Sequence, residues 1–137
     1  MREHTVPQSL PKHLKIGLVG ENAATDFYIK SGFEILERNY HVGKAEVDII
    51  ATDKEYFVFC EVKSRMASPD APAPYGRPAR AVTKEKRDHM KQAAAYFMRR
   101  YRKSGKRFRF DIIEVYLSDD YKVLHLHHLK SAFTADR

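Results

Sequence analysis

Two stretches of the chain carry apolar residues at helical spacing, and each predicts a helix that packs against a sheet. The first covers about residues 13–31 and stops at Gly32, a natural C-terminal cap. Its apolar stripe consists of Ile16, Val19, Ala23 and Phe27. The second covers about residues 83–103. Its packing stripe consists of Met90, Ala93, Ala94, Phe97, Met98 and Tyr101.

Between and after these two stretches, five runs have the residue pattern of β-strands. They lie near residues 33–42, 45–52, 55–65, 107–117 and 121–128. Gly43 and the pair Asp53-Lys54 supply turns short enough for antiparallel hairpins, and the last two runs are joined by three polar residues, 118–120. The order helix, three strands, helix, two strands predicts a mixed sheet with helices packed against it, an α/β protein of the α+β mixed-sheet kind.

The length of 137 residues fits one domain with a single ordinary core. We expect a loose lead-in over residues 1–12, one domain over 13–130 and a C-terminal tail over 131–137. Within the domain, residues 66–81 hold four prolines and a glycine, so this stretch predicts a long irregular loop.

Composition favours a cytoplasmic protein without membrane contact. No apolar stretch approaches the roughly 20 residues that span a bilayer. The N-terminus lacks the apolar segment of a signal peptide. The single Cys60 cannot form an internal disulfide, which fits a reducing compartment, and it is expected to be a small buried apolar residue.

The net charge of +7 comes from one segment. Residues 84–109 hold 11 Lys and Arg against 2 acidic residues, whereas the remainder holds 14 basic and 16 acidic residues. Such a segment predicts a surface for a polyanion, although a solvated helix face would show the same pattern. The candidate nucleic-acid-binding residues are Lys84, Lys86, Arg87, Lys91, Gln92, Tyr96, Arg99 and Arg100.

Charged residues interrupt two neighbouring apolar strands. Asp48 lies within the run 45–52, and Glu61 and Lys63 leave one face of the run 55–65 because side chains alternate along a strand. Two carboxylates with a main-chain carbonyl, that of Val62, suffice to hold Mg²⁺ or Mn²⁺. Lys63 would then hold or activate a water that attacks phosphate. An ordinary ion pair is the alternative for each residue taken alone.

Other acidic residues are less clearly assigned. Glu21 follows Gly17 and Gly20, which would allow a close approach to the sheet, so it is either a third carboxylate of the site or a surface ion-pair partner. Glu46 either joins the site or pairs with a neighbouring base. Asp111 is expected to be structural. The group His125, His127 and His128 lacks the accompanying ligands of a zinc site.

Three segments together resemble the YraN family of small bacterial proteins. They are Gly17–Glu21 with Ala24, the run Ala45–Ala51, and the run Phe57–Arg65, with Arg109–Ile113 similar to the family's last motif. The family is similar to the PD-(D/E)xK nuclease superfamily, so the resemblance implies a restriction-endonuclease-like fold with an αβββαβ core. Two departures are Ala45 in place of a glycine and Val47 in place of the superfamily's proline.

The resemblance makes Asp48 the motif aspartate, Glu61-Val62-Lys63 the (D/E)xK element and Glu21 the helix-borne acidic residue. Gln92 and Tyr96 match a Gln-x-x-x-Tyr pattern of one branch. The expected function is metal-dependent hydrolysis of phosphodiester bonds in DNA, including branched or structured DNA. The alternatives are a non-catalytic nucleic-acid-binding accessory protein and action on RNA. Because many resolvase-like nucleases act as two-fold dimers, a homodimer is one expected assembly.

Overall fold

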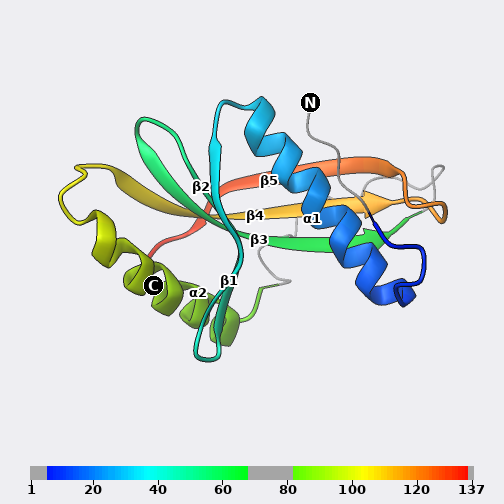
Figure 1. The fold of residues 1–137 in the computed structure, drawn as a ribbon, viewed down its shortest axis with the longest axis horizontal. Helices are drawn as coiled ribbons and strands as arrows, with labels where there is room; N and C mark the ends of the chain where they lie inside the picture. The colour runs from blue at the N-terminus through cyan, green and yellow to red at the C-terminus, as the bar shows by residue number, and fades with distance from the viewer. Residues whose placement is uncertain (1–5, 68–81, 136–137) are drawn as a thin grey trace.

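The computed structural model describes residues 6–67 and 82–135, which fold into a five-stranded sheet with two α-helices (Figure 1). The elements are α1 (Lys12–Lys30), β1 (Glu34–Val42), β2 (Ala45–Thr52), β3 (Tyr56–Met66), α2 (Lys84–Met98), a 3₁₀ turn (Arg99–Tyr101), β4 (Arg107–Leu117) and β5 (Val123–Phe133). The strand order is β1-β2-β3-β4-β5. Only the β3–β4 pair is parallel, so the sheet is mixed as predicted.

The sequence pattern located each element, and the differences are at the ends. The β1–β2 and β2–β3 hairpins are antiparallel, as their short turns require. The second helix ends at Met98 and tightens into the 3₁₀ turn, five residues before the predicted end at 103. The last strand continues to Phe133, beyond the predicted end at 128, because Phe133 pairs with Phe110 and their rings stack. The predicted loop 66–81 begins too early, because Met66 still belongs to β3, and residues 68–81 of it lie outside the described residues.

The helices cover opposite faces of the sheet and so divide its core in two. Successive residues of β3 show the division, because Phe57 and Phe59 pack with the α2 residue Phe97, while Val58 packs with the α1 residue Tyr28. Toward its end β3 becomes mixed, because Val62 and Met66 still pack against the α1 side of the core while Glu61 and Lys63 leave the other face. None of the described helices is both long and apolar enough to cross a membrane.

The first helix approaches the sheet through Gly20. A Cβ atom at Gly20 would lie 1.7 Å from Oγ of Ser64 on β3. The buried side of α1 therefore carries Gly20, Ala24 and Tyr28, and the predicted stripe flanks it, only partly buried. The expectation for Gly17 was wrong, because a Cβ atom there would meet nothing within 4 Å.

These two glycines give a matched test of the packing. Gly20→Ala is expected to destabilise the protein by about 1–3 kcal/mol, because the helix must move away from Ser64. Gly17→Ala is expected to stabilise it by up to about 1 kcal/mol, since alanine favours a helix and meets no neighbour. Urea denaturation of both variants measures the two changes. Equal effects of the same sign would contradict this account of the α1–β3 contact.

Candidate active site

Asp48 and Glu61 meet where the β2–β3 ladder ends. Ile49 and Cys60 form the last pair of that ladder, and one further step along the register sets Asp48 opposite Glu61. Instead of continuing the ladder, Oδ2 of Asp48 accepts a hydrogen bond of 2.8 Å from the main-chain N–H of Val62. The structure thus brings together the two carboxylates that the sequence placed on separate strands.

The two carboxyl groups perturb each other. Burial, followed by the charge and hydrogen-bonding proximity of Glu61, raises the pKa of Asp48 from 3.8 to about 8. The Val62 N–H and the Lys86 ammonium act in the opposite direction. Glu61 is only 6% exposed, and its Oε1 is buried without a hydrogen-bond partner among the described residues. Two carboxyls this close, one buried and the other partly buried, favour either a shared proton or a bound cation.

The raised pKa of Asp48 predicts how stability depends on pH in the absence of divalent cations. The folded protein holds a proton that the unfolded chain releases near pH 3.8, so this contribution to stability is lost as pH rises from about 4 to about 8. We expect the free energy of unfolding to fall more steeply across that window in the wild type than in Asp48→Asn. Urea titrations at several pH values measure the difference, and parallel curves would refute the assignment.

Two lysines approach Glu61 from different elements. Nζ of Lys63 lies 3.7 Å from Oε2, and this side chain is 34% exposed. Nζ of Lys86, from the first turn of α2, lies 3.4 Å from Oε1. Lys63 stands where the sequence predicted it. Lys86 was predicted only as a nucleic-acid contact, and nothing in the sequence links position 86 to position 61.

Glu21 lies near the pair but is held by other partners. Its Oε1 accepts hydrogen bonds from Nε of Arg38 at 3.0 Å and from Nδ2 of Asn39 at 2.9 Å. Burial raises the pKa of Glu21. The contacts with Arg38 and Asn39 act in the opposite direction, and the charge of Asp48 raises the pKa further. Glu21 therefore senses Asp48 electrostatically. In the part of the chain that the structure describes, no three His, Cys, Asp or Glu side chains gather in a metal-binding group.

The backbone of β1 is bent opposite Asp48. Asn39 adopts a left-handed conformation with φ of 53°, between Arg38, which pairs with Ile49, and Tyr40, which pairs with Val47. Asparagine tolerates this region better than most residues. On β2, Val47 packs in the α2 core, whereas Ile49 packs in the α1 core. The strands therefore twist locally around Asp48, and that twist sets its direction.

The side chains of Glu46, Gln92 and Tyr96 lie outside the acidic site. Glu46 directs its side chain toward His41, at 3.9 Å, so it does not extend the acidic group. Gln92 and Tyr96 lie on the exposed side of α2, roughly 9 Å or more along the helix axis from Lys86. The guanidinium of Arg99 stacks on the ring of Tyr96 at 5.3 Å. This row is a surface feature.

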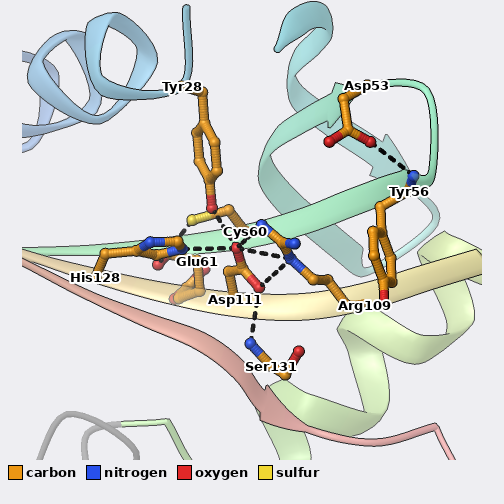
Figure 2. A network of polar contacts seen from close by, with 9 residues as sticks. All are labelled: Tyr28, Asp53, Tyr56, Cys60, Glu61, Arg109, Asp111, His128 and Ser131. Atoms are coloured by element: carbon orange, nitrogen blue, oxygen red, sulfur yellow. Dashed lines mark hydrogen bonds and ion pairs between the residues drawn. The ribbon is translucent and has the colours of Figure 1, made fainter. Parts of the chain in front are cut away.

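Asp111 is the centre of a buried polar network on the α1 side of the sheet (Figure 2). It accepts hydrogen bonds from Tyr28 Oη at 2.8 Å, from the Arg109 guanidinium and from the N–H of Ser131 at 3.0 Å, and it lies 2.7 Å from Nε2 of His128. Burial would raise its pKa, but His128, the Ser131 N–H and Arg109 together lower it below 3.8. The network joins α1, β4 and β5, which fits the predicted structural role.

The three histidines of β5 contact other side chains of the protein. His128 is committed to Asp111, and Nδ1 of His127 lies 4.0 Å from the buried carboxylate of Glu114. His125 contacts the ring of Tyr116. Cys60 is buried and free of a disulfide, and burial raises the pKa of its thiol, as expected for a small core residue.

Comparison with known proteins places this chain in a family. A family model described as "Uncharacterised protein family UPF0102" matches residues 20–115. The chain is 39% identical over 119 residues to a UPF0102 protein of Caldicellulosiruptor saccharolyticus, and 40% identical over 119 residues to one of Dictyoglomus thermophilum. Both matches cover 87% of this chain and 97% of the relative. A third relative, from Clostridium botulinum, is 42% identical over 104 residues, 75% of this chain and 80% of its own. The chain therefore belongs to the UPF0102 family, also called the YraN family.

Proposed function

We propose that this protein is a Mg²⁺- or Mn²⁺-dependent endonuclease that hydrolyses phosphodiester bonds in DNA, including branched or structured DNA. One observation carries the proposal. The partly buried carboxyl group of Asp48 and the buried one of Glu61 meet at the end of an apolar ladder, and Lys63 stands beside them. Such an arrangement is costly for folding and is typical of a site that needs charge.

The residues present fit a hard divalent cation. Oε1 of Glu61 is buried without a hydrogen-bond partner among the described residues, so it has an uncommitted lone pair. The carbonyl of Val62 leaves β3 on the same side as its N–H, which bonds to Asp48. Asp48, Glu61 and the Val62 carbonyl would therefore hold the ion, with waters filling the remaining positions. When bound, the ion would supply a Lewis acid for the phosphate and favour ionisation of a bound water.

The other side chains would position the reacting groups. Lys63 is partly exposed and lies 3.7 Å from Glu61, so its ammonium group can donate to the attacking water and hold it in line with the phosphorus. Glu21, fixed by Arg38 and Asn39, adds negative charge near Asp48 and would strengthen cation binding without direct contact.

The basic helix supports DNA as the partner. Beyond Lys86, α2 and the turn after it present an exposed row of Gln92, Tyr96, Arg99 and Arg100. Basic side chains that neutralise phosphates release counter-ions, so binding should weaken steeply with salt. The row follows Lys86 along the same helix, and Lys86 reaches Glu61, so α2 would lead the DNA backbone from the row toward the acidic site.

Purified protein incubated with branched and linear DNA in Mg²⁺ or Mn²⁺ tests the proposal. We expect cleavage that EDTA abolishes and that Asp48→Ala and Lys63→Ala both remove. Cleavage that survives both substitutions unchanged would reject the assigned site. Salt-sensitive binding without strand scission under any condition would favour the accessory-protein alternative, and preferential cleavage of RNA of equal length would change the substrate class.

A further inference from the structure

Lys86 occupies an unusual position for a lysine on a basic helix. It lies in the first turn of α2, whose start is fixed by a hydrogen bond from the Lys86 N–H to the side chain of Thr83. The N-terminal turn of a helix favours acidic side chains, so a cation here needs another source of attraction. Its side chain is only 24% exposed and runs inward to the acidic site.

The contacts of its ammonium group supply that attraction. Nζ lies 3.4 Å from Oε1 of Glu61 and donates to the main-chain oxygen of Glu46 at 3.4 Å. Both distances exceed the 2.7–2.9 Å that is usual for a charge-assisted hydrogen bond. The ammonium thus neutralises Glu61 without satisfying Oε1, which lacks a hydrogen bond within the described chain. Lys84, two residues earlier on the helix, differs from it, because its side chain is 81% exposed and pairs with Asp88.

A divalent cation on Glu61 would compete directly with this ammonium group. Magnesium binds carboxylate oxygens at about 2.0–2.1 Å, so an ion held by Glu61 would lie within a few ångströms of the Lys86 ammonium. Repulsion between them favours release of the longer and weaker contact. The lysine remains tethered to α2 beside the site, with its charge no longer cancelled by Glu61.

We propose that Lys86 is the internal counter-ion of the acidic site, that a divalent cation displaces it from Glu61, and that the displaced ammonium group then contacts a DNA phosphate. This inference rests on the proposed function. It assigns Lys86 a role distinct from that of the other basic residues of α2, because its contribution to DNA binding would require the metal ion.

Calorimetric titration with Mg²⁺, at a pH of about 8.5 so that protons compete little, tests the displacement. Lys86→Met is expected to bind Mg²⁺ about tenfold more tightly than the wild type, which corresponds to about 1.4 kcal/mol. Lys86→Arg keeps the competing charge and should stay near the wild type. Lys122→Met is the control, because that lysine is exposed and pairs only loosely with Asp120 at 3.7 Å. Circular dichroism checks that each variant is folded.

DNA binding with and without a divalent cation tests the second step. With Ca²⁺ present, Lys86→Met is expected to weaken DNA binding severalfold, and in EDTA to change it little. Arg99→Met should weaken binding in both conditions, because that side chain is exposed and its guanidinium lies over the ring of Tyr96 rather than beside Glu61. An equal loss for Lys86→Met in EDTA and in Ca²⁺ would overturn this step.

The outcomes separate the two proposals. If the wild type and Lys86→Met bind Mg²⁺ equally, the counter-ion role is overturned and the nuclease proposal stands. A wild type that binds no Mg²⁺, with Asp48→Asn indistinguishable from it, would overturn both.

Discussion

Asp48→Asn is expected to abolish Mg²⁺ binding and DNA cleavage together. The amide oxygen can still accept the hydrogen bond from the Val62 N–H, so the strand geometry survives, but the second negative charge of the pair is gone. We expect metal affinity to fall by about 100-fold or more and cleavage by about 10³-fold or more. Calorimetry and a cleavage assay on the same preparation measure both quantities.

Lys63→Met provides the contrast that assigns the roles. It leaves both carboxylates in place, so Mg²⁺ should still bind, whereas cleavage should fall by about 10²–10⁴-fold because the attacking water loses its partner. Loss of metal binding with Lys63→Met, or full cleavage with Asp48→Asn, would show that the roles are wrongly divided.

Asp111→Asn is expected to be the most destabilising single substitution of a polar residue outside the site. Asp111 is fully buried, and its carboxylate neutralises Arg109 and faces His128. Removing the charge leaves the guanidinium buried without its partner, which costs about 3–5 kcal/mol. Urea denaturation near neutral pH measures this loss as a lower transition midpoint.

A second acidic residue on the same protein serves as the control. Asp88 pairs with Lys84 at 2.8 Å on the surface of α2, where solvent screens the pair, so Asp88→Asn should leave the transition midpoint nearly unchanged. The pH dependence gives an independent check. Because the pKa of Asp111 is lowered in the folded state, its contribution is present above about pH 4 and is lost as pH falls further. A wild type and an Asp111→Asn variant that lose stability equally in acid would contradict the role of this network.

The local pattern was sufficient to locate the elements and the two carboxylate-bearing strands. Alternation along β3 set Glu61 and Lys63 on one face and Cys60 on the other, and the structure agrees. Short turns at Gly43 and Asp53-Lys54 made antiparallel neighbours of β1, β2 and β3, which sets Asp48 beside Glu61. These features depend on the strand period and on loop length, both of which are local properties.

The local pattern could not predict which residues of distant segments contact one another. Gly17 and Gly20 lie three residues apart in the same helix and are equivalent in the sequence pattern, but only Gly20 faces Ser64. The role of Glu21 depends on hydrogen bonds from Arg38 and Asn39 of β1, and Asn39 reaches it from a left-handed backbone conformation. In the sequence Lys86 is one of many basic residues, and only the packing of α2 against the sheet shows that it lies beside Glu61.

The sequence by itself determined the order of the elements, the mixed sheet and the strands that carry Asp48, Glu61 and Lys63. The tertiary structure alone decided the partners of the charged groups. Asp48 accepts a hydrogen bond from the Val62 N–H, Lys86 lies beside Glu61, and Glu21 pairs with Arg38 of β1. The reason is physical. Periodicity specifies the face of an element on which a side chain lies, whereas the partner of a charge depends on how elements distant in the chain pack and on the burial that makes such a partner necessary.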